Sequence, residues 1–410
     1  MAVKKNNLGD HLHPQARSRA ACTVRLARLE RLERFDSFAP LRKAWCALQR
    51  DAEPAPFQTL EWCENWYATA GAARGWQPAL IAGYAQGGAL VLLLPLMVRR
   101  FGPVGIARPL GDRNAGSHAP LLAPGMLSIL SRRDIEQLSA KLKALLPGID
   151  LLVLGDQPER LHGRSSPWLG LTHMETGNAL SQMQLGADWR KIDAAHRSAK
   201  SRSKERNREN GLKRLGHLEF CVADTAQERG QMFAALCDQK SAWFRAAGLP
   251  DLLADEATRA FLRSIALLEQ SETAPSGVLT GLRLDGDFIA LNMGVVHRDH
   301  YAGLMLSTAE GETRRHSPGH LLITRTLQHA AQTGITQFSF GSGESDIKRR
   351  WADQRVGLYL CTAPYTAKGR ACEAGVRGFA GLRQLVKSNP RLWRYAERFR
   401  RFRTLAPQMP

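Results

Sequence analysis

The sequence predicts an α/β protein made of two similar halves, each a mixed β-sheet flanked by helices. Strand-length apolar segments alternate with segments of helical periodicity, and a glycine turn joins two apolar strands once in each half. These hairpin signals are Gln86-Gly87-Gly88 and Asp285-Gly286-Asp287. In both halves the hairpin is followed by a helix, a glycine and a short strand. We therefore prefer an internal duplication to two unrelated domains.

The chain has 410 residues, 44% of them hydrophobic and 23% charged, which is enough apolar material for two ordinary cores. The longest apolar run, residues 89–98, contains Pro95 and falls short of the roughly 20 residues of a membrane-spanning helix, so we predict a buried strand. Basic residues near the start precede no apolar segment, which predicts a cytoplasmic protein without a secretory signal. Seven cysteines without C-x-x-C spacing predict neither a disulfide framework nor a cysteine-based zinc site, and we expect no metal cofactor.

Lysine and arginine exceed aspartate and glutamate by 57 − 38 = 19 residues. Such an excess predicts attraction to an anionic partner. CoA, nucleic acid, acidic lipid and phosphorylated sugar all qualify, so the charge alone leaves the partner open.

The predicted domain plan has a polar leader (1–22), a first half (23–186), a second half (187–368) and a basic amphipathic tail (369–410). In the first half, we predict strands at 23–30, 78–84, 89–98 and 149–154. Helices are predicted at 35–52, around Trp62 and Trp66, and at 129–146.

The second half opens with a strongly basic helix that begins at residue 188. The pattern then predicts strands at 217–222, 277–284, 288–296, 301–306 and 335–340. Helices are predicted at 227–246, 256–270 and 318–333, and Gly334 ends the last of them in the C′ position.

Candidate binding groups gather where the helix at 318–333 begins. Ser317 is a suitable N-cap, and a proline suits the first helical turn. Free backbone N–H groups and the positive end of the helix dipole would attract a phosphate there, and Gly319 would let it come close. Arg314 and Arg315 add positive charge. An ordinary capped helix explains the same residues, and this alternative stays open.

Polar residues follow the predicted strand at 335–340, at the end where open α/β sheets keep their ligands. Glu344 or Asp346 could remove a proton from a nucleophile, and Lys348 could stabilise negative charge on a carbonyl oxygen. His316 is a further candidate base. A solvated loop with a chance Asp–Lys pair is the alternative.

The order of short motifs over residues 35–365 adds a family resemblance. The motifs are Trp45, Pro56-Phe57-Gln58, Trp62 with Trp66, Pro95-Leu96, Arg197-Ser198, Asp285-Gly286 with Ile289-Ala290, Ser317-Pro318-Gly319, Phe340-Gly341, and Lys348 with Trp351. In this order they resemble the CelD-type, cellulose-biosynthesis branch of the GNAT acetyltransferases, which is related to the FemAB-like transferases. The resemblance implies two tandem GNAT folds, with acyl-CoA held in a splayed sheet of the second.

The resemblance also implies roles for single residues. Ser317, Gly319 and the helix that follows would hold the pyrophosphate of the donor, and Lys348 falls where FemAB-like enzymes place a lysine near the reacting carbonyl. The chain departs from the family pattern in two places, since the loop has only one glycine and Ile347 replaces a common aromatic. The donor is therefore acyl-CoA of undefined chain length or an aminoacyl-tRNA.

Two basic stretches have more than one explanation. Cations recur at steps of two to four over residues 189–208, so they decorate more than one helix face, and a solvated surface would explain them. Alternatively, Arg197 and Lys200 contact an anionic acceptor, tRNA phosphates or lipid headgroups; we place Trp351 beside them as a substrate-binding residue. The tail at 376–403 mixes Trp, Phe and Leu with arginine, which suits a membrane interface or a domain cap.

Asn292 interrupts an apolar strand, so it either pairs with a backbone group or faces the ligand, and we keep it among the donor-binding candidates. His297 and His300 have no third ligand nearby in the sequence. We interpret them as turn residues rather than a metal site.

The main hypothesis is direct transfer of an acyl group from acyl-CoA to an amine or hydroxyl of a cell-envelope or polysaccharide precursor. No convincing nucleophile–base pair suggests a covalent intermediate. Backbone N–H groups of the strand at 288–296 would then polarise the thioester carbonyl. Two alternatives are aminoacyl transfer from tRNA and a non-catalytic subunit of an exopolysaccharide assembly at the membrane.

Overall fold

The structure is a computed structural model that describes residues 29–388 apart from 53, 270 and 272–273. The predicted polar leader and the end of the predicted tail, from residue 389, lie outside the described residues. Among the described residues, no helix is long and apolar enough to cross a membrane.

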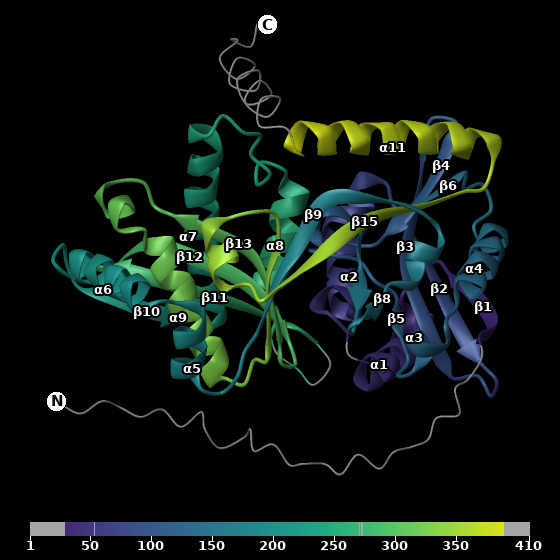
Figure 1. The fold of residues 1–410 in the computed structure, drawn as a ribbon. Helices are drawn as coiled ribbons and strands as arrows, with labels where there is room; N and C mark the ends of the chain where they lie inside the picture. Colours follow the sequence, from purple (N-terminus) through teal and green to yellow (C-terminus); the bar gives the residue numbers. More distant parts are fainter. Residues whose placement is uncertain (1–28, 53, 270, 272–273, 389–410) are drawn as a thin grey trace, which may run out of the picture.

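The first half contributes strands and short helices in the order that the sequence predicts, with additions (Figure 1). Its helices are α1 (Arg42–Asp51), α2 (Leu60–Trp66), α3 (Met126–Ile129) and α4 (Arg132–Leu145). Its strands are β1 (Leu29–Phe35), β2 (Gln77–Ala85), β3 (Leu90–Phe101), β4 (Val104–Pro109), β5 (Leu121–Leu122), β6 (Leu151–Pro158), β7 (Arg160–Leu161), β8 (Arg164–Ser165) and β9 (Thr172–Gln184).

The second half contains the predicted basic helix as two pieces, because Arg197 and Ser198 are extended and Ser198 caps the second piece through Ser201 N. The helices are α5 (Trp189–His196), α6 (Ala199–Lys213), α7 (Ala226–Ala246), α8 (Glu256–Ala266), α9 (Pro318–Gln332), α10 (Asp346–Trp351) and α11 (Ala367–Ser388). The strands are β10 (Leu218–Val222), β11 (Ser276–Leu284), β12 (Asp287–His297), β13 (His300–Thr308), β14 (Gln337–Ser342) and β15 (Gln354–Pro364).

Both glycine hairpins and the helix-ending glycine are confirmed. The turn between β2 and β3 contains Gly87 and Gly88 with φ of 92° and 81°, and Gly286 between β11 and β12 has φ of 92°. Gly334 follows α9 with φ of 84°, a left-handed conformation that glycine adopts without steric cost.

The two halves share one mixed sheet rather than two. The order of its main strands is β1-β2-β3-β4-β6-β15-β9-β14-β13-β12-β11-β10, and β5 pairs with β3. In the first half β4 runs parallel to β6, and in the second half β13 runs parallel to β14. The two halves thus repeat the same arrangement, four mainly antiparallel strands followed by a parallel neighbour. The predicted class, a mixed α/β fold with a repeated unit, is confirmed.

The strand that completes each half comes from the other half, and we call this arrangement the strand exchange. β15, from the end of the chain, pairs with β6 of the first half, whereas β9, from the first half, pairs with β14 of the second. β9 and β15 also pair with each other over Thr172 to Gln182, and they cross the middle of the molecule together (Figure 1). The predicted boundary at 186/187 stays a prediction, and the sheet is continuous across it.

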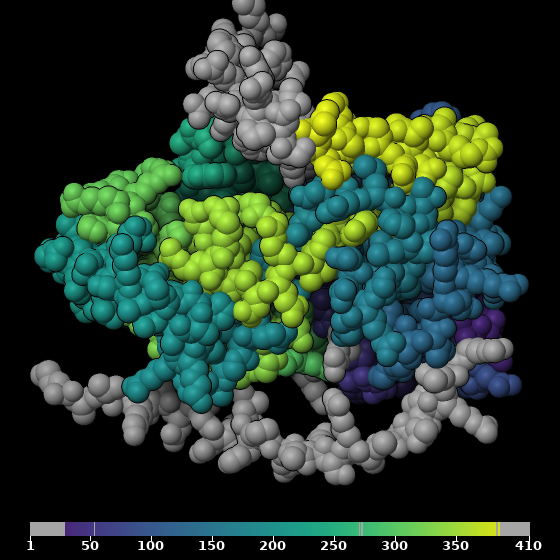
Figure 2. Space-filling model, viewed as in Figure 1, coloured from purple at the N-terminus to yellow at the C-terminus, as the bar shows by residue number. Residues whose placement is uncertain are grey.

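Helices and side chains also join the halves. Trp62 on α2 packs edge-on against Phe261 on α8, with ring centroids 4.9 Å apart, inside a core cluster that contains residues of both halves. Arg298, in the turn between β12 and β13, donates hydrogen bonds to the carbonyls of Gln49 and Ala52 at 3.0 and 2.9 Å. These carbonyls end α1, so Arg298 of the second half caps a helix of the first. Figure 2 shows α11 lying along the surface above the first half.

Candidate functional site

The parallel strands β13 and β14 separate after three residue pairs. They pair from His300 with Gln337 to Ala302 with Ser339 and no further. Gly303 and Gly341 meet at the point of separation, where a Cβ on Gly341 would lie 3.2 Å from the Gly303 carbonyl oxygen. Beyond these glycines the edge of β13 has no neighbouring strand, which leaves a gap in the sheet.

β13 carries a bulge at the start of this gap. Met293 of β12 faces Met305, but the preceding pair is Gly294 with Gly303, so Leu304 is an extra residue. Consequently, Leu304 and Met305 both pack against the same core cluster, although successive strand residues normally face opposite sides. Bulges of this kind redirect backbone groups and are frequent near active sites.

The register shows which backbone groups of β13 face the gap. Ala309 N donates to Ile289 O at 3.0 Å, so these residues form a hydrogen-bonded pair. Such pairs alternate along an antiparallel ladder, and Leu306 opposite Asn292 therefore belongs to a pair without hydrogen bonds. The N–H and C=O of Leu306 point away from β12, toward the gap.

This geometry corrects the prediction that the strand at 288–296 polarises a bound carbonyl. That strand is β12, which pairs with β11 on one edge and β13 on the other. Its backbone N–H groups are used within the sheet. The strand whose groups remain available is β13, the next one along the chain.

α9 begins at one end of the gap, directly after a short helical turn over Glu312–His316. Ser317 precedes α9 in the left-handed conformation, with φ of 52° and ψ of 56°, and its side chain makes no capping hydrogen bond. Ser317 therefore occupies the predicted N-cap position, but its side chain does not form the capping hydrogen bond. Gly319 is buried, and a Cβ there would lie 3.1 Å from Thr308 Cγ2. Gly319 thus allows α9 to pack closely against β13.

Cations surround the first turn of α9. The pKa of His320 is lowered by burial, and the charges of Arg350 and Arg208 lower it further, against an opposing effect of Asp346. Arg208 lies on α6 and Arg350 on α10, both partly buried. Neither forms an ion pair with another residue of the described ranges. Two elements, α6 and α10, therefore bring positive charge to the N-terminal end of α9, which favours an anion there.

The three predicted residues just before α9, Arg314, Arg315 and His316, differ in their partners and in their exposure. Arg314 pairs with Glu310 and Arg315 with Glu312, and both arginines are at least half exposed. The ring of His316 packs against Gly211 of α6, where an added Cβ would lie 2.4 Å from two ring atoms. Arg315 Nε lies 3.2 Å from His316 Nε2. Of these three, His316 is the one that the fold encloses.

Lys348 lies on α10, which Ser345 caps by accepting a hydrogen bond from Lys348 N at 3.2 Å. Its ammonium donates to the carbonyl of Ser342, at the end of β14. Burial lowers the pKa of Lys348 to about 8, against the opposing charge of Glu344. Glu344 itself pairs with Arg355, and Asp346 pairs with Arg349.

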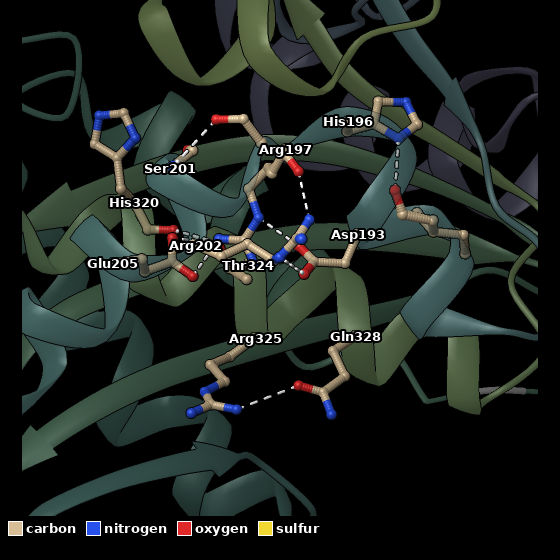
Figure 3. Close-up of polar contacts among 12 residues, drawn as sticks. Asp193, His196, Arg197, Ser201, Arg202, Glu205, His320, Thr324, Arg325 and Gln328 are labelled. Atoms are coloured by element: carbon tan, nitrogen blue, oxygen red, sulfur yellow. Dashed lines mark hydrogen bonds and ion pairs between the residues drawn. The ribbon is translucent and has the colours of Figure 1, made fainter.

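Figure 3 shows an ion network around Arg197, a residue that the fold buries. The guanidinium of Arg197 pairs with Asp193 on α5 and with Glu205 on α6, and it lies over the ring of Trp351 at 5.0 Å. Thr324 of α9 donates to the second Glu205 oxygen at 3.0 Å. The network therefore connects α5, α6, α9 and α10.

The three predicted acceptor-binding residues, Arg197, Lys200 and Trp351, differ in their exposure to solvent. Arg197 is 7% exposed and Trp351 is 1% exposed, and the ring of Trp351 also packs against Trp189 and His196. Both residues have structural partners inside the protein and are placed to position α10. Lys200, in contrast, is exposed on the first turn of α6.

Asn292 is also buried, and its amide donates to Tyr301 Oη at 2.7 Å and to Thr280 Oγ1 at 3.4 Å. Thr280 in turn pairs with Thr326 of α9 at 2.8 Å. The Asn292 partners are side chains, not a backbone group. Through these hydrogen bonds, Asn292 of β12 connects to β11, β13 and α9 inside the protein.

The structure therefore places His316, Ser317 and Gly319 where α9 begins, after β13, and it places Glu344, Asp346 and Lys348 directly after β14. It adds residues that sequence reasoning missed, namely His320, Arg208, Arg350 and the bulge at Leu304. His320 directly follows the predicted motif Ser317-Pro318-Gly319, so its place in the sequence could have indicated it. Arg208 and Arg350 had none, because they meet only in the folded chain.

Comparisons with known proteins agree with this geometry. Residues 199–349 match the family described as "Acetyltransferase (GNAT) domain". The crystal structure of FemX is similar with a TM-score of 0.55 and 11% identity, over 78% of this chain and 94% of that one. No curated protein sequence matches the chain.

Two further solved structures have lower scores. The C-terminal domain of a putative lysylphosphatidylglycerol synthetase from Agrobacterium fabrum has a TM-score of 0.49 and 12% identity, over 82% of this chain and 95% of that one. A tandem GNAT protein from the clavulanic acid biosynthesis pathway has a TM-score of 0.47 and 14% identity, over 83% and 99%.

The match covers the separated parallel strands β13 and β14, so residues 199–349 are a domain of the GNAT acetyltransferase type. The protein is an acyltransferase.

Proposed function

We propose that the protein transfers an acyl group from acyl-CoA directly to an amine or hydroxyl of an acceptor, in the gap between β13 and β14. The observation that carries this proposal is the position of that gap, which opens beside the N-terminus of α9. A thioester in the gap would lie against the edge of β13. The donor's pyrophosphate would lie at α9, within reach of Arg208 and Arg350.

The N–H of Leu306 is the group that we assign to the thioester carbonyl, because it faces the gap. A backbone N–H that is fixed in place before the reaction stabilises the developing oxyanion without reorganisation. Lys348, on the opposite side of the gap, supplies a positive charge from an environment with little water.

We assign proton removal from the acceptor to Glu344 rather than to Asp346 or His316. Glu344 is the carboxylate whose charge acts on Lys348, so it is near the reacting end of the gap. The acceptor attacks the acyl carbon, the C–S bond breaks, and the proton passes from the acceptor through Glu344 to the departing CoA thiolate. Direct transfer requires no covalent intermediate.

Calorimetric titration with acetyl-CoA and with longer acyl-CoA esters tests this proposal. The double variant Arg208→Ala/Arg350→Ala should weaken binding by about tenfold or more, because two charge-assisted contacts to phosphate are lost. Arg206→Ala is the matched control, since Arg206 lies on the exposed side of α6. Unchanged affinity in the double variant, or no binding by the wild type, would reject the donor site.

The acceptor class is inferred from the resemblance to the CelD-type branch. We propose a cell-envelope or polysaccharide precursor, which is available at the cytoplasmic side of the membrane. Thiol release from acyl-CoA, measured across a panel of amino sugars and their nucleotide derivatives, tests this class. Turnover confined to unrelated amines would contradict it.

Aminoacyl transfer from tRNA is the second candidate, favoured by the exposed cations of α6. Lys200, Lys204 and Arg206 are all exposed on this helix. Binding to tRNA should then weaken steeply as the salt concentration rises. In Lys200→Ala, which removes one phosphate contact, the slope of log K against log salt concentration should become smaller by about one. A flat salt dependence would leave acyl-CoA as the donor.

A further inference from the structure

The face of the gap covered by α7 carries a lysine that the proposed mechanism does not use. α7 packs over β12 and β13. Both polar atoms of the Gln239 side-chain amide form hydrogen bonds that hold the helix in this position. Gln239 Nε2 donates to Phe288 O at 2.7 Å, and Ser307 Oγ donates to Gln239 Oε1 at 2.8 Å. The next residue along the helix, Lys240, is therefore held in a defined position above β13.

The ammonium of Lys240 reaches the open edge of β13. Lys240 Nζ lies 3.4 Å from the carbonyl oxygen of Leu306. That carbonyl points into the gap, on the same edge as the N–H assigned to the thioester. Lys240 therefore enters the gap from the α7 face, opposite the face covered by α9.

Aromatic rings enclose the same ammonium. Lys240 Nζ lies 4.3 Å from the centroid of Trp243 and 5.4 Å from that of Phe244. Both rings are on the following turn of α7. Cation–π contacts stabilise an ammonium that has lost part of its water.

No carboxylate of the described residues compensates the charge of Lys240. Its pKa is lowered by burial, and no acidic side chain opposes this effect. The three N–H donors of an ammonium need acceptors, and the hydrogen bond to Leu306 uses one of them. A half-buried cation without an anion is unfavourable unless a ligand supplies the negative charge.

We propose that Lys240 is the acceptor-side binding residue and holds an anionic oxygen group, a carboxylate or a phosphate, next to the nucleophile that receives the acyl group. The inference rests on the proposed function, because it places the thioester in the same gap. It restricts the acceptor to anionic amines or alcohols. Donor binding at α9 does not depend on it.

Lysine footprinting of the full chain tests the inference without requiring turnover. Reductive methylation is followed at each lysine by peptide mass spectrometry in the presence of paired probes. Glucose 6-phosphate is compared with glucose, and lactate with propane-1,2-diol, so that the two pairs distinguish phosphate from carboxylate. The anionic member of at least one pair should slow modification of Lys240 about threefold or more, while exposed Lys141 stays unchanged. Equal protection by charged and neutral probes, or none by any probe, would overturn the proposal.

A kinetic comparison separates this inference from the proposed function. Lys240→Met should raise KM for glucosamine 6-phosphate relative to glucosamine by about tenfold, the value of one charge-assisted hydrogen bond, and Lys240→Arg should restore most of it. Lys141→Met is the matched control. Acetyl-CoA affinity should stay unchanged in all three variants. A loss of acetyl-CoA binding in Lys240→Met, or an equal effect on both sugars, would count against Lys240 as an acceptor residue while leaving the donor site to its own test.

Discussion

The guanidinium of Arg197 lies over the indole of Trp351 at 5.0 Å, and the two residues lie just outside the two ends of the matched domain, residues 199–349. The same guanidinium pairs with Asp193 and Glu205. Because Trp351 ends α10, this contact sets the position of the helix that carries Lys348.

Removing Arg197 should therefore destabilise the protein strongly. Arg197→Met leaves the buried carboxylate of Glu205 without an ion-pair partner and leaves Asp193 with Arg202 alone, at 3.9 Å, so we expect a loss of about 3–5 kcal/mol in the free energy of unfolding. Urea denaturation followed by tryptophan fluorescence measures it. Arg206→Met, on the exposed side of α6, should change stability by less than about 0.5 kcal/mol. Similar losses in both variants would show that the network has no special role.

Lys348 should make the rate fall as the pH rises through about 8, because its pKa is lowered to that value and the charged form is the active one. Lys348→Met should reduce kcat by about 100-fold, the effect typical of losing an oxyanion-stabilising group. Lys348→Arg keeps its charge, so its falling limb should move beyond pH 10. Thiol release from acetyl-CoA with a saturating acceptor gives both profiles. If the falling limb of the pH–rate profile stays near pH 8 in Lys348→Arg, another group is responsible for it.

The same shift has a consequence for stability. The folded-state pKa of Lys348 lies below its ordinary value of 10.5, so the unfolded chain binds more protons between about 8 and 10.5. The charged side chain therefore costs stability below pH 8, and this cost disappears as the pH rises toward 10.5. The stability difference between Lys348→Met and the wild type should shrink over that window.

Ser317 occupies a conformation that favours glycine. Ser317→Gly should stabilise the protein by about 0.5–1 kcal/mol, the left-handed penalty of a side chain less the added backbone entropy of glycine. Ser317→Val should destabilise it, because a β-branched residue tolerates φ of 52° poorly. Thermal unfolding ranks the three proteins. Acetyl-CoA affinity should survive in Ser317→Gly if backbone groups, rather than the hydroxyl, hold the donor.

His297 should weaken the fold in acid. Burial lowers its pKa to about 4, and neither ring nitrogen has a hydrogen-bond partner among the described residues. The unfolded chain therefore binds more protons between pH 6.5 and 4, and stability should fall by roughly 2–3 kcal/mol as the pH decreases through that window. Urea midpoints at several pH values should show a smaller acid effect in His297→Phe. Exposed His217→Gln is the control, and an equal effect there would assign the acid sensitivity elsewhere.

Local patterns in the sequence predicted much of this molecule. The hairpins at Gly87 and Gly286, the helix that begins after Ser317 and the glycine that ends it all depend on neighbouring residues. For such features, a few residues contain the whole physical cause.

Features that depend on distant partners could not be predicted in this way. β9 mixes polar and apolar residues over its 13 positions and does not show the pattern of a buried strand. Its neighbours β14 and β15 lie more than 150 residues away in the sequence. Lys240 is similar, since within α7 it looks like one polar residue of an amphipathic helix. Its position at the gap follows only from the packing of α7 on β13.

The strand exchange also affects how the protein is made. When residues up to 186 have left the ribosome, the first half still has an open edge at β6, and β15 is synthesised almost 170 residues later. Contacts across such a separation slow folding, and an unpaired β6 invites pairing with other chains. Neither half is therefore a self-sufficient folding unit. A chain that stops before residue 354 should leave β6 and β9 without the strand that lies between them.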